Sequence, residues 1–188
     1  MKLNVRRDDI DFGTNILEVK VPKELRNKCA TGLDYIDTTL GGHGFTPSMV
    51  TMFTGTPGAG KTTMMLIMAD SLAKQGKLVV FNTAEESLHQ VKMVVERLGL
   101  KNGFMVGQET HTPTLLEKCD AIRNKRGNKN KQFVLIVDSL QCMEDGQYSY
   151  INSRTPERVL QQITEWAKTH YTMAMIVGQV NKGGQMSG

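Results

Sequence analysis

One stretch of this sequence constrains the fold more than any other. Its residues are Gly55, Thr56, Pro57, Gly58, Ala59, Gly60, Lys61 and Thr62, which fit the pattern G-x-x-x-x-G-K-[ST] at every fixed position. A strand pattern at 48–54 precedes this loop, and a helix pattern at 61–74 follows it. In that setting the glycines let backbone N–H groups turn toward phosphate oxygens, and the helix adds the positive end of its dipole. The sequence therefore predicts a phosphate-binding loop inside an α/β fold.

The remainder of the chain alternates between strand and helix patterns. Apolar runs at 78–82, 133–137 and 174–178 predict further strands, and helix patterns begin at residues 87, 112 and 155. The strands read as unbroken apolar runs rather than alternating ones, which is typical of a parallel sheet buried on both faces. We therefore predict a mostly parallel central sheet with helices on both faces. Residues 1–27 are charged and only weakly periodic, and we interpret them as an N-terminal extension of a core at 28–188.

The loop and one strand end carry chemistry that suits a nucleoside triphosphate. Lys61 is expected to reach the β and γ phosphates, and the Thr62 hydroxyl to bind Mg²⁺, with Thr63 as its near-equivalent neighbour. Asp138 ends the apolar run 133–137, where its carboxylate would hold the same Mg²⁺. The alternatives are a glycine turn that binds no ligand and an aspartate that caps the next turn. We expect ATP and Mg²⁺ as the cofactors.

Two further strand ends carry candidate catalytic groups. Glu85 and Glu86 follow the strand 78–82, and we assign Glu85 as the general base that activates water, with Glu86 as the second candidate. The alternative is a pair of helix-start acids favoured by the helix dipole. If strand geometry continues this far, the period-two rule places the two carboxylates on opposite sides.

The last predicted strand ends in Gln179. Its neutral amide can bond a γ phosphate on one side and a loop on the other, which suits a sensor of nucleotide state. The alternative is an ordinary polar residue at a strand end. Because ligands of open α/β sheets bind at the carboxyl ends of the strands, we expect Lys61, Glu85, Asp138 and Gln179 to meet at one site.

Several segments resemble the RecA superfamily of ATPases, and most of all its RadA/Sms and KaiC branch. Residues 31–42 resemble the pattern T-G-x-x-x-x-D-x-x-L-G-G, and the phosphate loop, TAEES at 83–87, VDSLQ at 137–141 and VGQVNK at 177–182 follow in family order. The resemblance implies a RecA-like P-loop fold and a DNA-dependent ATPase that couples ATP state to single-stranded DNA binding and to strand exchange or branch migration. It also implies a homo-oligomeric ring or filament, with Glu85 activating water and Gln179 sensing the γ phosphate.

The chain departs from bacterial RadA at recognisable points. It contains no C-x-x-C zinc motif, and Gln179 stands where bacterial RadA usually has histidine. We therefore expect either a small recombinase core of the phage type or a shortened piece of a longer protein. In both cases the resemblance implies that the chain ends within the second DNA-binding loop. A KaiC-like regulatory switch that does not use DNA and a replicative-helicase-type motor are the alternative functions.

Two segments are candidates for DNA contact, and their positions match the two DNA loops of RecA-like proteins. Residues 145–154 offer Tyr148, Tyr150 and Arg154, since tyrosines stack on bases and arginine neutralises a phosphate. The second segment, 181–188, is glycine-rich and offers Lys182. The alternative for both is an ordinary surface loop. The basic run at 123–132 is interpreted as a solvated loop.

Composition limits the classes of protein that remain. No apolar run approaches the ~18 residues of a membrane span, and the N-terminus has no apolar signal core. The three cysteines are far apart and odd in number, which argues against a disulfide framework and for a reducing, cytoplasmic location. The net charge of +4 permits a polyanionic partner but does not require one.

Overall fold

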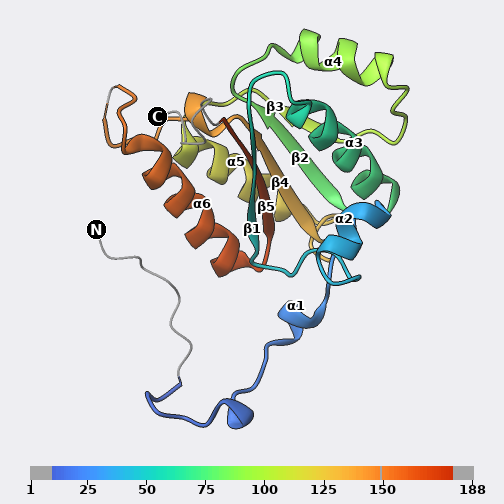
Figure 1. Ribbon diagram of the computed structural model, residues 1–188. Helices are drawn as coiled ribbons and strands as arrows, with labels where there is room; N and C mark the ends of the chain where they lie inside the picture. Colours follow the sequence, from blue (N-terminus) through green and yellow to red (C-terminus); the bar gives the residue numbers. More distant parts are fainter. Residues whose placement is uncertain (1–9, 149, 180–188) are drawn as a thin grey trace.

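The computed structural model describes residues 10–148 and 150–179 and is built on one five-stranded sheet, shown in Figure 1. All strand pairs are parallel, and the spatial order is β1-β5-β4-β2-β3. The strands are β1 (Val50–Gly55), β2 (Leu78–Thr83), β3 (Met105–Gly107), β4 (Phe133–Asp138) and β5 (Met173–Gln179). The helices are α1 (Lys23–Arg26), α2 (Asp34–Thr39), α3 (Lys61–Lys74), α4 (Leu88–Arg97), α5 (Thr112–Arg123) and α6 (Thr155–His170).

The strands are buried on both faces, as their unbroken apolar runs predict. Alternate residues of one strand enter different cores: Val79 and Phe81 of β2 face α3 and α4, whereas Leu78 and Val80 face α5 and α6. Figure 1 shows the two helix layers on opposite sides of the sheet. The predicted α/β fold with a central parallel sheet is therefore confirmed, and the sheet is parallel throughout.

Most predicted elements are present, but several short ones were not predicted from the sequence, among them β3 and α2. The three-residue edge strand β3 and the six-residue helix α2 have no long periodic pattern of their own. Their conformation depends on neighbours, since β3 pairs only with β2. The longest described helix, α6, has 16 residues, and none of the described helices offers the long apolar stretch that a bilayer crossing requires.

The segment 31–42, at the start of the core, is held by hydrogen bonds within itself and to α3. The Asp37 carboxylate accepts hydrogen bonds from the backbone N–H groups of Thr31 and Gly32 and from the Thr31 hydroxyl. Ser71 of α3 donates to the Thr31 carbonyl at 2.7 Å. Gly32 has φ +73°, and an added Cβ would lie 2.9 Å from the Ser71 hydroxyl oxygen. Glycine at this position therefore allows the positive φ and leaves room for the Ser71 side chain. The hydrogen bond from Ser71 joins the segment 31–42 to α3.

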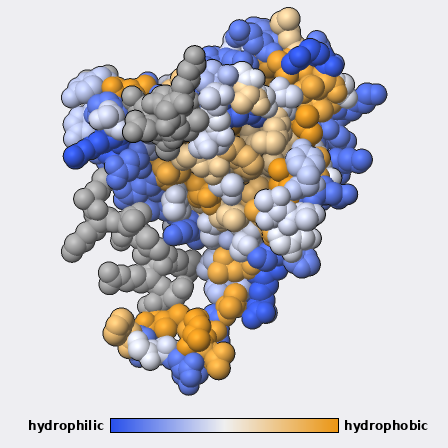
Figure 2. Space-filling model, in the orientation of Figure 1, coloured by the Kyte–Doolittle hydropathy of each residue, from blue (hydrophilic) through white to orange (hydrophobic). Residues whose placement is uncertain are grey.

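The described part of the N-terminal region, 10–27, carries no buried side chain. It extends away from the sheet in Figure 1, and its end forms an apolar patch at the bottom of Figure 2. Phe12, Ile16 and Leu17 are the most exposed large apolar side chains there. A surface of this kind is more typical of an interaction segment than of a folded domain.

Candidate nucleotide-binding site

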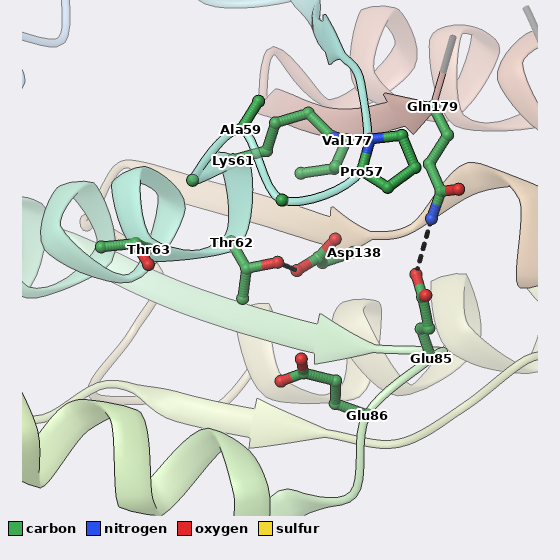
Figure 3. A pocket seen from close by; sticks show the side chains of 12 residues that line it. Pro57, Ala59, Lys61, Thr62, Thr63, Glu85, Glu86, Asp138, Val177 and Gln179 are labelled. Atoms are coloured by element: carbon green, nitrogen blue, oxygen red, sulfur yellow. Dashed lines mark hydrogen bonds between the residues drawn. The ribbon is translucent and has the colours of Figure 1, made fainter. Parts of the chain in front are cut away.

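The candidate groups converge because the sheet brings their strand ends to one edge. Gly55 of β1 is in register with Gln179 of β5, and Thr83 of β2 with Asp138 of β4. A cavity of about 300 Å³ opens at this edge. Figure 3 shows the side chains that line it. The residues that line it are Pro57, Gly58, Ala59, Gly60, Lys61, Thr62, Thr63, Glu85, Glu86, Asp138, Val177 and Gln179. Four separate segments of the chain thus contribute polar groups to one hollow.

The phosphate loop forms one wall of the cavity and leads into α3. Gly58 and Gly60 have φ values of +78° and +82°, which a side chain with a Cβ rarely adopts. Gly60 precedes the first turn of α3, whose N–H groups have no partner within the helix. The Lys61 ammonium donates to the carbonyls of Gly55 at 2.8 Å and Thr56 at 2.9 Å, so it lies folded against the loop. This wall offers a positive charge and free N–H donors, which together suit an anion.

Thr62 and Asp138 bring two side-chain oxygens together in the cavity. The Thr62 hydroxyl donates to Asp138 Oδ2 at 2.5 Å across 76 positions of sequence. Mg²⁺ prefers hard oxygen ligands and is held in nucleotide sites by one or two protein groups together with phosphates and water. These two side chains fit that pattern. Among the described residues no cluster of three or more acidic, cysteine or histidine side chains could hold a metal without such a co-ligand.

Asp138 is buried, and burial of its ionised carboxylate lowers the stability of the fold when no ligand is bound. Only 6% of the residue is exposed. Burial raises the pKa of Asp138, and the charges of Glu85 and Glu86 raise it further, against the opposing effects of the Thr62 hydrogen bond and of Lys61. A carboxyl whose folded-state pKa lies above its unfolded value destabilises the fold as pH rises through that interval. The ionised side chain is therefore held at some cost in the stability of the fold.

We expect Asp138→Asn to raise the melting temperature of the nucleotide-free, metal-free protein at pH 7. Asparagine removes the charge but keeps an oxygen that accepts from Thr62. The gain should disappear near pH 3, below the ordinary aspartate pKa of about 3.9, because the wild-type carboxyl is then neutral as well. In a domain of this size ~1 kcal/mol moves the melting temperature by ~2–4 °C. Thermal unfolding between pH 3 and 8 measures it, and a variant less stable than wild type at pH 7 would contradict the argument.

Glu85 and Glu86 are arranged differently from the sequence expectation. Strand geometry ends at Thr83, and residues 84–86 form a bend. The Thr83 hydroxyl closes this bend by accepting from the Glu86 N–H at 3.0 Å and donating to the Glu86 carbonyl at 2.7 Å. The period-two rule therefore does not apply here, and both carboxylates line the cavity instead of facing opposite sides.

Glu85 is the carboxylate connected to the neighbouring strands. Its Oε2 accepts from Gln179 Nε2 at 3.0 Å, the contact dashed in Figure 3, and from the Ser139 hydroxyl at 3.1 Å. The Gln179 carbonyl in turn accepts from Gln141 Nε2 at 3.3 Å. Sequence reasoning assigned no role to Ser139 or Gln141. Both residues lie directly after a buried strand and within the segment 137–141 that carries the family resemblance, but neither signal showed that they reach the site.

The first candidate DNA segment lies beside α6. Tyr148 and Tyr150 are 51% and 65% exposed, and their ring centroids are 6.1 Å apart. Arg154 is exposed at the start of α6. Arg158, which sequence reasoning missed, lies 4.8 Å from the centre of the Tyr148 ring and forms an ion pair with the buried Asp145. Lys182 and the second candidate segment lie outside the described residues.

Comparison with known proteins agrees with this architecture. A family model described as the KaiC ATPase matches residues 29–111. The DNA repair protein RadA of Aquifex aeolicus (strain VF5) is 32% identical over 169 residues, which cover 88% of this chain and 36% of that protein. These matches show that the chain is similar to the RadA and KaiC branch of the RecA superfamily. RadA of Mycobacterium tuberculosis (strain CDC 1551 / Oshkosh) is 28% identical to this chain over 165 residues, which cover 85% of the chain and 32% of that protein.

Solved structures show the same RecA-like fold. A DnaB-like replicative helicase, described with its interactions with primase, superposes with a TM-score of 0.68 at 13% identity, over 82% of this chain and 45% of the helicase. A second solved structure, described as an ATPase domain, superposes with a TM-score of 0.67 at 13% identity, over 83% of this chain and 65% of that domain. The chain spans about a third of the length of the curated relatives it matches.

Proposed function

We propose that the chain binds ATP with Mg²⁺ in the 300 Å³ cavity and hydrolyses it to ADP and phosphate. The convergence of Lys61, the Thr62–Asp138 pair and the Glu85–Gln179 pair around one hollow is the observation that carries this proposal. The match of residues 29–111 to the family model described as the KaiC ATPase supports it.

Each wall of the cavity has a distinct task in this proposal. The N–H groups of residues 58–63 and the Lys61 ammonium bind the phosphate oxygens, and Lys61 exchanges the carbonyls of Gly55 and Thr56 for them. Thr62 and Asp138 hold Mg²⁺, whose positive charge offsets the charge of the phosphates when it is bound. Thr63 lines the same wall as a neighbouring hydroxyl.

Glu85 acts on the attacking water. Its carboxylate takes the proton of a water molecule whose oxygen forms a bond to the γ phosphorus, while the bond from that phosphorus to the bridging oxygen of ADP breaks. Gln179 bonds Glu85 directly, so a γ phosphate that draws the amide away changes the base and the end of β5 together. In this way the site couples the presence of ATP to the chain that follows residue 179.

We further propose single-stranded DNA as the effector and a homo-oligomer as the working form. Tyr148 and Tyr150 present two exposed rings in the segment that also carries the exposed Arg154, which suits stacking on bases and contact with a phosphate. The relatives named DNA repair protein RadA support a role in recombination or repair. The exposed apolar side chains of 10–27 support assembly of the core at 28–188 through this extension.

ATP turnover with and without single-stranded DNA, measured over a range of protein concentrations, tests the proposal. We expect DNA to stimulate turnover several-fold, and specific activity to rise with protein concentration as subunits assemble. Stimulation should fall as salt rises, because each phosphate contact releases counterions. Turnover that is independent of DNA at every concentration would contradict the DNA role.

A double variant locates the DNA contact. Tyr148→Ala with Arg154→Ala should weaken single-stranded DNA binding about tenfold or more, since one stacked base is worth ~1–3 kcal/mol, and should leave basal turnover unchanged. The fold should survive, because the Arg158–Asp145 ion pair remains when the Tyr148 ring is removed. Lys125→Ala with Lys129→Ala, in the exposed basic run, is the matched control. Unchanged DNA affinity in the first variant would remove this segment from the proposal.

One observation favours a second candidate function. The KaiC family model covers residues 29–111 and therefore excludes the tyrosine segment. A nucleotide-dependent switch without DNA would keep every part of the cavity described above. It would show ATP-dependent assembly but no response of turnover or assembly to DNA.

A further inference from the structure

We infer that Ser139 is a positioning residue that holds the Glu85 carboxylate in the orientation needed to activate water. The inference rests on the proposed ATP hydrolysis and deepens it. Its basis is the 3.1 Å hydrogen bond from the Ser139 hydroxyl to Glu85 Oε2, which joins two segments 54 positions apart in sequence.

The pairing of β2 with β4 places Ser139 close to Glu85. Thr83 of β2 is in register with Asp138 of β4, and the Ala84 N–H donates to the Asp138 carbonyl at 2.7 Å. The parallel pairing thus continues one residue beyond β2 and places Ala84 opposite Ser139. Glu85 follows directly after Ala84, and its side chain reaches the Ser139 hydroxyl. Ser139 is fully buried at 0% exposure, which keeps its hydroxyl in place.

Glu85 needs such an anchor because it lies on an exposed bend. A free glutamate side chain samples many rotamers, and fixing one costs up to ~2 kcal/mol. Both donors, Ser139 and Gln179, bind the same oxygen, Oε2. Among the described residues no group donates to Oε1, which is therefore the oxygen available to a water molecule. Two donors on one oxygen fix the direction in which the other one points.

The two anchors differ in what nucleotide would do to them. Gln179 lines the cavity at the end of β5, where the proposed contact with the γ phosphate competes with its contact to Glu85. Ser139 does not line the cavity and has no such competitor. When Gln179 turns to the phosphate, Ser139 is the group that still holds the base.

A second acceptor near Ser139 defines the alternative. The Cys142 sulfur lies 3.9 Å from the Ser139 hydroxyl oxygen, so the single proton can be directed to either partner. The carboxylate is closer and charged, and hydrogen bonds to charged acceptors are about twice as strong as neutral ones. The Ser139 hydroxyl therefore donates to Glu85 rather than to Cys142 in the local turn. Cys142→Ala tests this, because it removes the sulfur acceptor and leaves the hydrogen bond to Glu85.

The test is steady-state ATP turnover of Ser139→Ala beside wild type. We expect kcat to fall about 10- to 100-fold, as the loss of a hydrogen bond to a charged group implies, with KM and ATP-analogue affinity within about twofold of wild type. Cys142→Ala should keep the wild-type kcat. Ser71→Ala, which removes a hydroxyl bonded to the Thr31 carbonyl far from the cavity, is the matched control for a lost serine hydrogen bond.

A double-mutant cycle makes the positioning role specific. In a Glu85→Gln background the hydroxyl has no base to orient, so adding Ser139→Ala should lower the residual kcat by less than about twofold. A fall of less than about threefold in the single variant, or a loss that is additive in the cycle, overturns the inference. A wild-type chain that does not hydrolyse ATP overturns the proposed function instead, and the two failures are thereby distinguished.

Discussion

Lys61→Ala is expected to abolish ATP turnover and to weaken ATP binding sharply. The ammonium is the single side-chain cation that lines the described cavity, and the phosphates of ATP bring several negative charges to it. Removing one preorganised donor to a transition-state oxygen costs roughly 10²–10³-fold in kcat, and a lost charge-assisted bond in the ground state costs roughly 10–100-fold in affinity. Turnover assays and titration with a fluorescent ATP analogue measure the two effects.

The fold should tolerate this substitution. Lys61 bonds only the carbonyls of Gly55 and Thr56, which lie at the exposed loop and can bond water instead. A cation at the start of α3 opposes the helix dipole, so alanine should keep or slightly raise the melting temperature. Lys74→Ala, in the last turn of the same helix, is the matched control and should keep wild-type turnover. A Lys61→Ala protein that turns over ATP at the wild-type rate would refute the nucleotide site.

The parts of this structure that local chemistry determines could be predicted from the sequence. The runs at 78–82 and 133–137 are apolar at every or nearly every position, and only a sheet covered on both faces buries such strands. The phosphate loop is similarly constrained, because glycine at 58 and 60 allows the positive φ angles found there. Parallel strands then bring their carboxyl ends to one edge, so the proximity of Lys61 and Asp138 followed from topology.

The parts that depend on contacts between distant segments could not be predicted. The three residues of β3 form a strand only because β2 offers its free edge. The bend after Thr83 arises from a side-chain hydroxyl that closes on Glu86, and it moves both carboxylates into the cavity against the alternation of a strand. The Ser139–Glu85 bond depends on the register of β2 with β4, which no local pattern encodes.

Glu85→Gln is expected to keep ATP bound and to stop its hydrolysis. Glutamine has the same shape, and its oxygen can still accept from Ser139 and Gln179, so the bend and the cavity should persist. The amide cannot take a proton from water at neutral pH, and loss of a general base costs about 10²–10⁴-fold in rate. Single-turnover hydrolysis, together with analogue binding, separates the chemical step from affinity. Hydrolysis at the wild-type rate would remove Glu85 from the role of base.

Glu86→Gln completes the experiment because both carboxylates line the same cavity and differ in their contacts. Glu85 is bonded to the ends of β4 and β5, whereas the Glu86 backbone is bonded to Thr83 of its own segment. A base must be held in a fixed orientation relative to the γ phosphate, and only Glu85 has side-chain contacts that provide this among the described residues. We therefore expect Glu86→Gln to lose no more than about tenfold in kcat, well short of the loss in Glu85→Gln. The reverse order would assign the base to Glu86 and make the Ser139–Glu85–Gln179 cluster a structural feature of the sheet edge.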